Sequence, residues 1–380
     1  MLKCDFCGNE DLKYFGKRKD GSYYCRRCIS FLGEAADENF KLNSKNGYLY
    51  IPYRLTEAQE KASSDILRAY KSGKNVLVYA VCGAGKTELV YKVIEYTLQK
   101  GGKVGFAIPR RDVVIELAKR LTGAFKNYKV TSVYGGNTSL LIGDIICLTT
   151  HQLFRYPHYF DLLILDEIDA FPYKNNFVLK NIFIRSVKGN YVLMSATPSD
   201  EEIEEYQKDG NSLVTLFKRH HGKPIPVPKI MVGFRFVLLI LLVIKGKKYL
   251  QENLPFLIFV GSIGDCETLY KFLKNLLKPG YFVHSKCKER KKIIDDFRDG
   301  KYKFLVTTAV LERGVTLKNL QVIVFDSDSN LYEKSTLIQI AGRVGRTKDA
   351  PSGEVIFMGK RKTKDMVAAI KEIERCNSML

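Results

Sequence analysis

The chain has 380 residues, which at roughly 100 to 200 residues per domain predicts two sizeable domains and excludes a peptide or a disordered tail. Hydrophobic residues make up 46% and charged residues 27%, both ordinary values for a globular protein. The charge balance is unusual, because 61 Lys and Arg against 41 Asp and Glu leave a net charge of +20. Residues 216–380 carry most of the excess, with 31 basic and 16 acidic residues. Such a basic surface favours a polyanionic partner, with nucleic acid the commonest.

The N-terminal sequence MLKCDFCGNE lacks the basic stretch and long apolar stretch of a secretory signal. The longest apolar run, residues 236–244, is far shorter than the ~20 residues that a membrane helix needs. We therefore expect a cytoplasmic protein without a transmembrane segment of its own. In that reducing compartment, grouped cysteines indicate metal ligands rather than disulfides.

Four cysteines near the N-terminus have the spacing of a zinc site. Cys4 and Cys7 form one CxxC pair, and Cys25 and Cys28 form a second pair after 17 intervening residues. Each pair places two sulfurs on one side of a tetrahedron, so a four-thiolate Zn²⁺ ribbon is predicted. A redox pair is the main competitor, but it needs only one CxxC. Two roles for this ribbon stay open: it either only stabilises the local structure or also contacts DNA through its basic residues.

A glycine-rich loop follows the apolar run VLVYAV and precedes a helical pattern. In this loop, CGAGKT, Gly83 and Gly85 let the backbone amides surround a phosphate at a helix N-terminus. Lys86 is expected to contact the β- and γ-phosphates of ATP, and Thr87 to bind Mg²⁺. Ala80 stands where the usual pattern has its first glycine, so the strict pattern is not met. The predicted nucleotide-binding loop comprises Gly83, Ala84, Gly85, Lys86 and Thr87.

The segment DLLILDEID, residues 161–169, supplies the expected acidic partner of this loop. Its apolar run predicts a buried strand that ends at Asp166 and Glu167, at the sheet edge where α/β proteins bind ligands. Asp166 is expected to hold Mg²⁺, and Glu167 to orient and deprotonate the attacking water. Upstream, the amide of Gln59 can read adenine, although a plain surface glutamine early in a helix is nearly as reasonable.

Strand and helix patterns alternate again after residue 250, which predicts a second parallel-sheet domain. The proline-rich segment before it is typical of a linker. We therefore expect an α/β protein with a zinc ribbon over residues 1–48, a first lobe over 49–215, a linker over 216–250 and a second lobe over 251–380. Near the C-terminus, the segment QIAGRVGR contains Arg343 and Arg346 and is interrupted by glycines. This pattern suits arginines that stabilise the charge on a γ-phosphate. A DNA contact is the alternative for one of the two arginines.

Six segments in this order resemble the motif series of superfamily two helicases: GAGKT, IPRRDVV, DEID, SATPS, TTAVLERGV and QIAGRVGR. With the four-cysteine ribbon, DEIDAFPY and RHHGKPIPVPK, the chain is most similar to the competence protein ComFA family, ATPases that help bacteria take up DNA. The resemblance implies two RecA-like lobes, with ATP bound in their cleft and single-stranded DNA across their tops. It also adds Gln339 to the catalytic residues. PriA-like helicases resemble the chain less, because they are longer and carry their cysteines between late motor motifs.

Carried over by motif, the resemblance implies strand contacts from both lobes. They are Arg110, Arg111, Gly135, Gly136 and Thr150 in the first lobe, and Ser262, Thr307 and Thr308 in the second. Many helicases place an aspartate after the Arg-Gly pair of VLERGVTL, but this chain has Val315 and Thr316 there, which puts ribose recognition from that side in doubt.

The sequence thus predicts an ATP-dependent translocase that pulls single-stranded DNA into the cytoplasm during natural transformation. Two alternatives stay open: a PriA-like DNA helicase in replication restart or repair, and a nucleotide-gated DNA-binding scaffold with little hydrolysis. The resemblance also implies two partners, the phosphoribosyltransferase-like protein ComFC and a membrane DNA-uptake channel, and hence a place at the inner face of the cell membrane.

Overall fold

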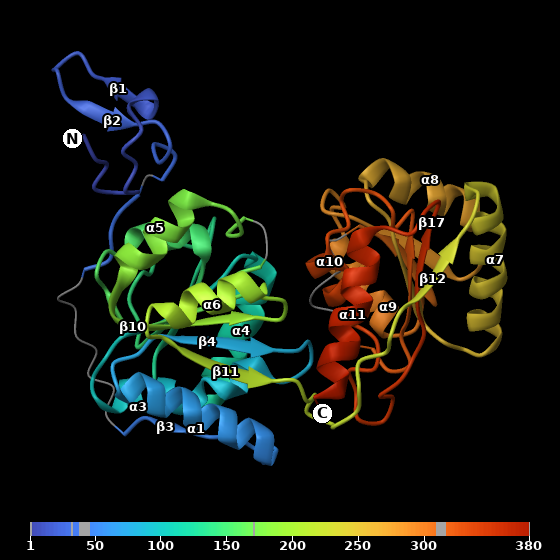
Figure 1. The fold of residues 1–380 in the computed structure, drawn as a ribbon, viewed down its shortest axis with the longest axis horizontal. Helices are drawn as coiled ribbons and strands as arrows, with labels where there is room; N and C mark the ends of the chain where they lie inside the picture. The colour runs from blue at the N-terminus through green and yellow to red at the C-terminus, as the bar shows by residue number, and fades with distance from the viewer. Residues whose placement is uncertain (1, 32, 38–45, 170–171, 309–316, 380) are drawn as a thin grey trace. The chain divides into compact units, whose positions relative to one another are not determined.

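The computed structural model describes the whole chain except residues 1, 32, 38–45, 170–171, 309–316 and 380. The chain forms two compact units, one of Met1–Ala80 and Gly85–Leu216 and the other of Val81–Ala84 and Phe217–Leu380 (Figure 1). Each unit contains its own parallel sheet, as expected for two RecA-like lobes. The predicted α/β class is confirmed.

The first unit is built around a seven-stranded sheet with the order β11-β4-β10-β9-β5-β8-β7, and all neighbouring strands in it are parallel. Its elements are β3 (Tyr48–Leu49), α1 (Glu57–Lys71), β4 (Val76–Ala80), α2 (Lys86–Leu89), α3 (Tyr91–Gln99), β5 (Val104–Ile108), α4 (Arg111–Ala124), β6 (Phe125–Lys126), β7 (Val130–Val133), β8 (Ile145–Thr149), the 3₁₀ helix η2 (Thr150–Arg155), β9 (Phe160–Asp166), α5 (Phe177–Ser186), β10 (Val187–Ser195), α6 (Asp200–Lys208) and β11 (Ser212–Leu216).

Helices cover both faces of this sheet, with α5 and α6 on one side and α1 and α3 on the other (Figure 1). The central strands are therefore buried on both faces, and β4, β5 and β8 are buried at every position. This explains why they appear in the sequence as continuous apolar runs rather than as alternating patterns. Because β10 lies between β4 and β9, the segments that follow these three strands meet at one edge of the sheet.

The second unit has a six-stranded parallel sheet with the order β12-β17-β16-β13-β15-β14. Its elements are β12 (Lys229–Val232), α7 (Arg235–Gln251), β13 (Phe256–Phe259), α8 (Ile263–Leu273), β14 (Gly280–Val283), α9 (Arg290–Arg298), β15 (Phe304–Thr307), β16 (Gln321–Phe325), α10 (Lys334–Ala341), β17 (Val355–Gly359) and α11 (Lys364–Ser378).

The segment expected to be a linker, residues 216–250, differs from that expectation. It contains the edge strand β12 and most of α7, both within the second unit. Leu238 and Leu242 of α7 are fully buried against the sheet, in one core with Phe256 and Ile258 of β13. The apolar run that the sequence shows at 236–244 thus packs one face of α7 onto the sheet.

The N-terminal ribbon consists of the 3₁₀ helix η1 (Leu12–Tyr14) and the antiparallel hairpin of β1 (Phe15–Lys17) and β2 (Tyr23–Cys25). Aromatic side chains attach it to the first unit: the ring of Phe6 lies 6.3 Å from that of Phe154, and Phe31 stacks on His151 at 6.0 Å. Both partners belong to η2. The ribbon therefore packs on the first unit through one side, and its hairpin extends away from that contact.

Candidate active site

The loop between β4 and α2 has the backbone geometry that its glycines predict. Gly83 and Gly85 have φ angles of +86° and +81°, in the left-handed region that side chains disfavour. A Cβ atom on Gly85 would also lie 2.5 Å from Nε2 of Gln59. Only glycine fits this position, and its backbone leads directly into Lys86 at the start of α2.

Lys86 and Asp166, which the sequence analysis assigned to one site, lie together in the first unit. Lys86 Nζ is 3.4 Å from Asp166 Oδ1, and the two side chains are only 18% and 15% exposed. The same carboxylate oxygen accepts a hydrogen bond of 2.8 Å from the backbone N–H of Glu167. Glu167 has a φ of +64°, which is rare for a residue with a side chain and typical of functional sites.

This donor set fits a magnesium nucleotide. Asp166 offers carboxylate oxygens next to Lys86, and the hydroxyl-bearing Thr87 follows Lys86 in α2. Hard oxygen ligands of this kind are those that Mg²⁺ prefers. Lys86 offers the positive charge that a phosphate needs, because its ammonium group lies in the same small space.

Gln59 lies beside the loop instead of on the surface. It is 5% exposed and forms a capping box with Thr56 at the start of α1, in which Gln59 Oε1 accepts from the Thr56 backbone N–H at 2.9 Å. This fixes the amide, so that its Nε2 lies against Gly85. The structure thus brings Gln59, one of the predicted site residues, next to the glycine loop.

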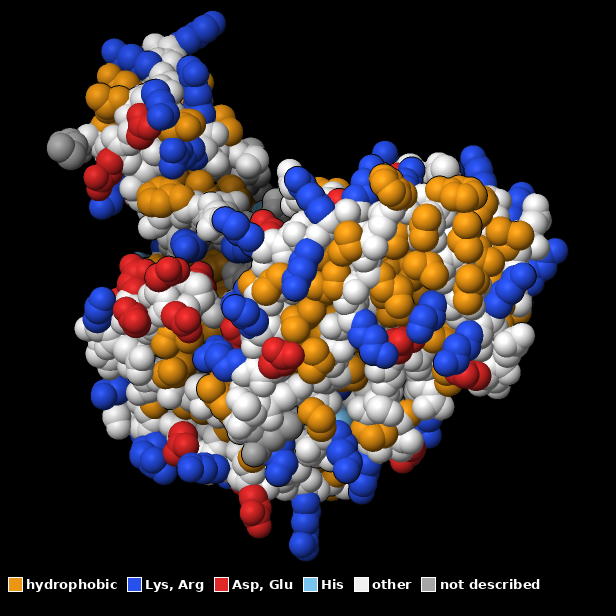
Figure 2. Space-filling model, turned by 45° about the vertical axis from the view of Figure 1, so that its right-hand side comes forward, with side chains coloured by type: hydrophobic (Ala, Val, Ile, Leu, Met, Phe, Trp, Pro, Cys, Tyr) orange, Lys and Arg blue, Asp and Glu red, His pale blue; other side chains and the backbone are white. Residues whose placement is uncertain are grey.

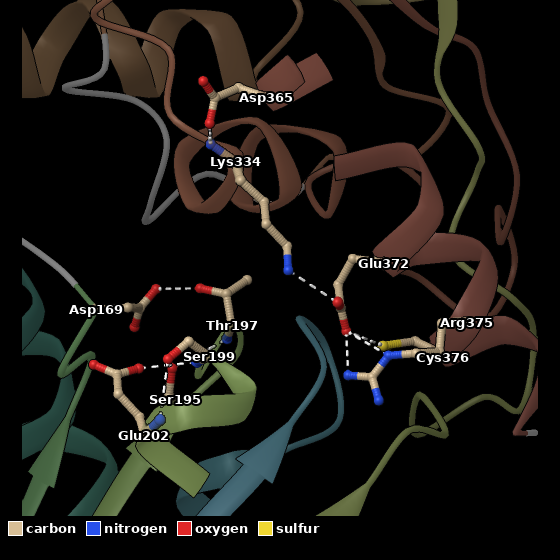
Figure 3. Close-up of polar contacts among 10 residues, drawn as sticks. All are labelled: Asp169, Ser195, Thr197, Ser199, Glu202, Lys334, Asp365, Glu372, Arg375 and Cys376. Carbon is tan, nitrogen blue, oxygen red and sulfur yellow. Dashed lines mark hydrogen bonds and ion pairs between the residues drawn. The ribbon is translucent and has the colours of Figure 1, made fainter. Parts of the chain in front are cut away.

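The tripeptide Ser195, Ala196 and Thr197 follows β10 and contacts the acidic segment after β9. Thr197 Oγ1 donates a hydrogen bond of 3.0 Å to Asp169 Oδ2, and the Thr197 backbone N–H donates to Ser195 Oγ at 3.0 Å (Figure 3). The ends of two neighbouring strands are thus joined by side chains.

The segment with the two candidate arginine fingers lies at the C-terminal end of α10. Gln339 is 7% exposed and Arg343 is 2% exposed, while Arg346 is half-buried and donates from Nε to Gly342 O at 2.8 Å. Helix α10 is tied to α11, because Lys334 Nζ lies 3.0 Å from Glu372 Oε2 (Figure 3). The predicted residues therefore lie on a firmly packed element of the second unit.

Arg219 is a residue of this region that sequence reasoning missed. The residue is 1% exposed, and its guanidinium donates to the carbonyl oxygens of Val344, Gly345 and Gly342 at 2.8, 2.7 and 3.2 Å. It also donates to Cys82 O at 3.2 Å, in the short segment that belongs to the same unit. Burial, together with the charge of Arg346, lowers the pKa of Arg219 to about 10, so the group stays charged at neutral pH.

These contacts make Arg219 a cap on the C-terminal end of α10. Helix ends leave carbonyl groups without partners and carry partial negative charge, which a buried cation satisfies. His221 adds a contact from Nε2 to Gly345 O at 2.8 Å. One signal in the sequence could have pointed to this role: a cluster of cationic side chains in a segment otherwise typical of a linker.

The candidate strand contacts of the first unit fall into two groups. Arg110 and Arg111 lie at the start of α4, and Gly135 and Gly136 lie exposed in the turn after β7, with open space around both glycines. Arg111 stacks over Tyr134, 4.7 Å from the ring centre. Thr150 differs, because it is fully buried at the start of η2, so its hydroxyl is not on the surface in this structure.

The candidates of the second unit are also divided. Ser262 is exposed as the N-cap of α8, where it accepts from the backbone N–H of Asp265 at 3.1 Å. Thr307 is fully buried at the end of β15 and bonds to Thr308 O, whereas Thr308 is half-buried. Val315 and Thr316 lie outside the described residues.

The four cysteines of the ribbon come together as predicted, with their sulfur atoms all within 4.8 Å of one another. Cys4 and Cys28 lie 3.6 Å apart, as do Cys7 and Cys25. Burial raises the pKa of the Cys7 thiol to about 11, so a thiolate here needs a cation beside it. Four convergent sulfurs fit Zn²⁺, which favours tetrahedral thiolate sites.

Comparison with known families identifies the class. Residues 56–206 match the DEAD/DEAH box helicase family, and residues 240–348 match the helicase conserved C-terminal domain. The structure of Saccharomyces cerevisiae Dbp5 bound to RNA and ADP BeF3 has the same fold, with a TM-score of 0.65 at 19% identity over 86% of this chain and 88% of that one. The chain is therefore an ATP-hydrolysing enzyme of the helicase type.

Two relatives narrow this class. The competence protein ComFA of Bacillus subtilis is 34% identical over 99% of this chain and 86% of its own length. The ComFA protein of Streptococcus pneumoniae is 35% identical over 94% of this chain and 86% of its own length. The chain belongs to the ComFA family of competence proteins.

Proposed function

We propose that this protein is an ATP-dependent translocase of single-stranded DNA that drives DNA uptake in natural transformation. The observation that carries the proposal is the convergence of Lys86 and Asp166 at 3.4 Å, in a chain of the ComFA family. The convergence supports hydrolysis of a magnesium nucleotide. The family supports the use of that hydrolysis in competence.

In this proposal the first unit binds and activates the nucleotide. Lys86 neutralises the β- and γ-phosphates, Thr87 and Asp166 hold Mg²⁺, and the amide of Gln59 contacts the adenine base. The bound Mg²⁺ supplies charge stabilisation for phosphoryl transfer. Glu167 orients the attacking water and accepts its proton. It is suited to this role because it directly follows Asp166 in the chain.

Residues of the second unit complete the proposed chemistry. Arg343 and Arg346 stabilise the charge that develops on the transferred phosphoryl group, with Gln339 from the same helical segment. The net positive charge of the chain, +20, suits backbone contacts to a strand without base preference. Arg110, Arg111, Gly135, Gly136, Ser262 and Thr308 are the candidates with exposed or half-buried positions.

The proposed cellular setting follows from the competence relatives. ComFC and a membrane DNA-uptake channel are the proposed partners, at the inner face of the cell membrane. Among the described residues, no helix has the length and apolar character that a bilayer crossing needs.

The test is ATP turnover measured alone and with single-stranded DNA, duplex DNA or RNA. We expect single-stranded DNA to give the largest stimulation. Lys86→Ala should abolish turnover while strand binding persists, because the lysine neutralises phosphate charge. Glu167→Gln should retain ATP binding and lose hydrolysis. Turnover of Lys86→Ala within a few-fold of the unchanged protein would refute the nucleotide site.

The same experiment separates the alternatives. A preference for forked or duplex DNA, with strand separation, would favour a helicase of replication or repair. Binding of single-stranded DNA controlled by ATP, with no turnover above background, would favour a scaffold. Glu167 and the two arginines argue against the scaffold, because a pure switch does not need hydrolytic residues.

A further inference from the structure

The hairpin of the zinc ribbon combines positive charge with accessible aromatic rings. Between Lys13 and Arg27 the chain has six basic residues and one acidic residue, Asp20. Lys13, Lys17, Arg18, Lys19 and Arg26 are all exposed. Figure 2 shows Lys and Arg side chains gathered over the ribbon at the upper left. This density of charge does not stabilise the ribbon, because like charges repel one another.

Three tyrosines lie among these cations. Tyr23 is 55% exposed, opposite Lys17 in the register of the hairpin, and the Lys17 ammonium lies 5.9 Å from its ring centre. The guanidinium of Arg18 lies 5.7 Å from the ring of Tyr24. That of Arg27 lies 3.9 Å from the ring of Tyr14. Each ring thus has a cation beside it.

The ring of Tyr24 is held in place by the fold of the hairpin. Tyr24 lies flat against the backbone of Gly16, where any Cβ atom would collide with its ring. The zinc cysteines bracket the hairpin, with Cys25 at the end of β2 and Cys7 and Cys28 packed beneath it in one buried cluster. Tyr23 lies on the ordered strand β2, paired with Lys17, so its backbone loses little entropy when the exposed ring binds a base, which is what a stacking platform needs.

We infer that this hairpin is a second binding site for single-stranded DNA, separate from the strand contacts of the two sheets. Unpaired bases stack on Tyr23, while Lys17, Arg18 and Lys19 contact the backbone phosphates. Rigid aromatic rings interleaved with cations are the chemistry that binds single strands without sequence preference. The inference rests on the proposed function, in that single-stranded DNA is the substrate of the motor.

The ribbon's attachment supports this assignment. Phe6 and Phe31 face η2, so the side of the ribbon that packs on the first unit is separate from the hairpin residues. A ribbon that served only as a staple would need this packed side and the four sulfurs. It would not need exposed tyrosines and lysines on the hairpin.

The test measures the affinity of the full, zinc-loaded protein for a labelled oligodeoxythymidine strand over a range of salt concentrations. Tyr23→Ala should weaken binding by about 5-fold or more, since stacking contributes about 1 to 3 kcal/mol per base. Tyr23→Phe keeps the ring and should bind within about 2-fold of the unchanged protein. Replacing Lys17 and Arg18 together by glutamine should reduce the slope of log affinity against log salt by about 1.4, at about 0.7 per phosphate contact.

Two controls keep the result specific. Lys3→Gln removes a ribbon lysine that pairs with Glu10 at 3.0 Å, away from the hairpin, and should leave the affinity unchanged. Zinc content and thermal unfolding of every variant should match those of the unchanged protein, because the replaced side chains are exposed. Duplex DNA offers no free base faces, so Tyr23→Ala should not change its binding.

Each result bears on one idea only. If the unchanged protein binds single strands and is stimulated by them, but Tyr23→Ala binds equally well, the hairpin site is refuted and the proposed function stands. An equal loss on duplex and single strands would refute stacking. Loss of transformation with unchanged strand affinity would show that the hairpin contacts a protein. If the unchanged protein neither binds nor responds to single strands, the proposed function itself fails.

Discussion

Replacing Arg219 by methionine should destabilise the loop that carries Arg343 and Arg346. The substitution keeps an unbranched side chain of similar length and removes a guanidinium whose nitrogens donate to four carbonyl oxygens at 2.7 to 3.2 Å. Each lost bond from a charged donor costs about 1.5 to 3 kcal/mol, but relief of the buried charge offsets part of the sum. A net loss of about 3 kcal/mol is expected, which for a domain of this size lowers Tm by about 6 to 12 °C.

The assay combines thermal unfolding with ATP turnover at saturating single-stranded DNA. Arg219→Met should reduce turnover more than it reduces nucleotide or strand affinity, because Arg219 is a positioning residue that acts through the loop. Arg219→Lys keeps the charge but offers a compact ammonium in place of a planar guanidinium. Its turnover and Tm should therefore lie between those of Arg219→Met and those of the unchanged protein. Arg361→Met is the matched control, because Arg361 is exposed on the same unit.

Amide hydrogen exchange locates the effect. Faster exchange should appear over residues 342–346, where the carbonyls lose their donor, while the strands of the same sheet keep their protection. If Arg219→Met unfolds within about 1 °C of the unchanged protein and retains its turnover, the guanidinium does not hold the loop.

Three further predictions concern metal, catalysis and pH. Elemental analysis should find one Zn²⁺ per chain in the unchanged protein and none in Cys25→Ser, whose ribbon should unfold while the two sheets stay folded; full zinc retention would contradict the site. Arg346→Ala should reduce DNA-stimulated turnover by about 10³-fold or more with little change in ATP affinity, and weakened strand binding with normal turnover would instead make Arg346 a DNA contact. Burial alone would raise the pKa of Glu354, but hydrogen bonds from Tyr249 at 2.6 Å and from Lys245 lower it to about 2. The stability it contributes is therefore present above its usual pKa of 4.5 and lost as the pH falls toward 2, so urea titrations should show that the free energy of unfolding of Glu354→Gln falls less than that of the unchanged protein over that interval.

The parts of the site that could be predicted from the sequence are those that depend on local backbone chemistry. The end of β4 and the loop residues up to Lys86 span only seven consecutive residues. The acidic residues Asp166 and Glu167 lie at the end of one buried strand, β9. Parallel strands bring such ends to one sheet edge, so the meeting of Lys86 and Asp166 follows from strand order. The convergence of the four cysteines could also be predicted, because the spacing of two CxxC pairs is typical of a tetrahedral metal site.

Burial at the junctions of elements was not predictable in this way. Thr150 opens η2 and Thr307 ends β15, and both are fully buried, which a motif alignment does not show. Arg219 looks like an exposed linker charge until the packing around the C-terminal end of α10 is known. The length of the apolar run at 236–244 was compatible with either a buried strand or a helix. In the structure it forms part of α7, which packs against β13.

The aromatic contacts between the ribbon and the first unit affect how much apolar surface the protein exposes. Phe6 and Phe31 cover Phe154 and neighbouring apolar residues of the first unit. Small four-cysteine ribbons generally fold only around a bound metal. A copy made under zinc starvation would expose these rings as an adhesive apolar surface on an otherwise folded motor. Such a surface promotes aggregation, so a metal held by the four cysteines would also protect the first unit.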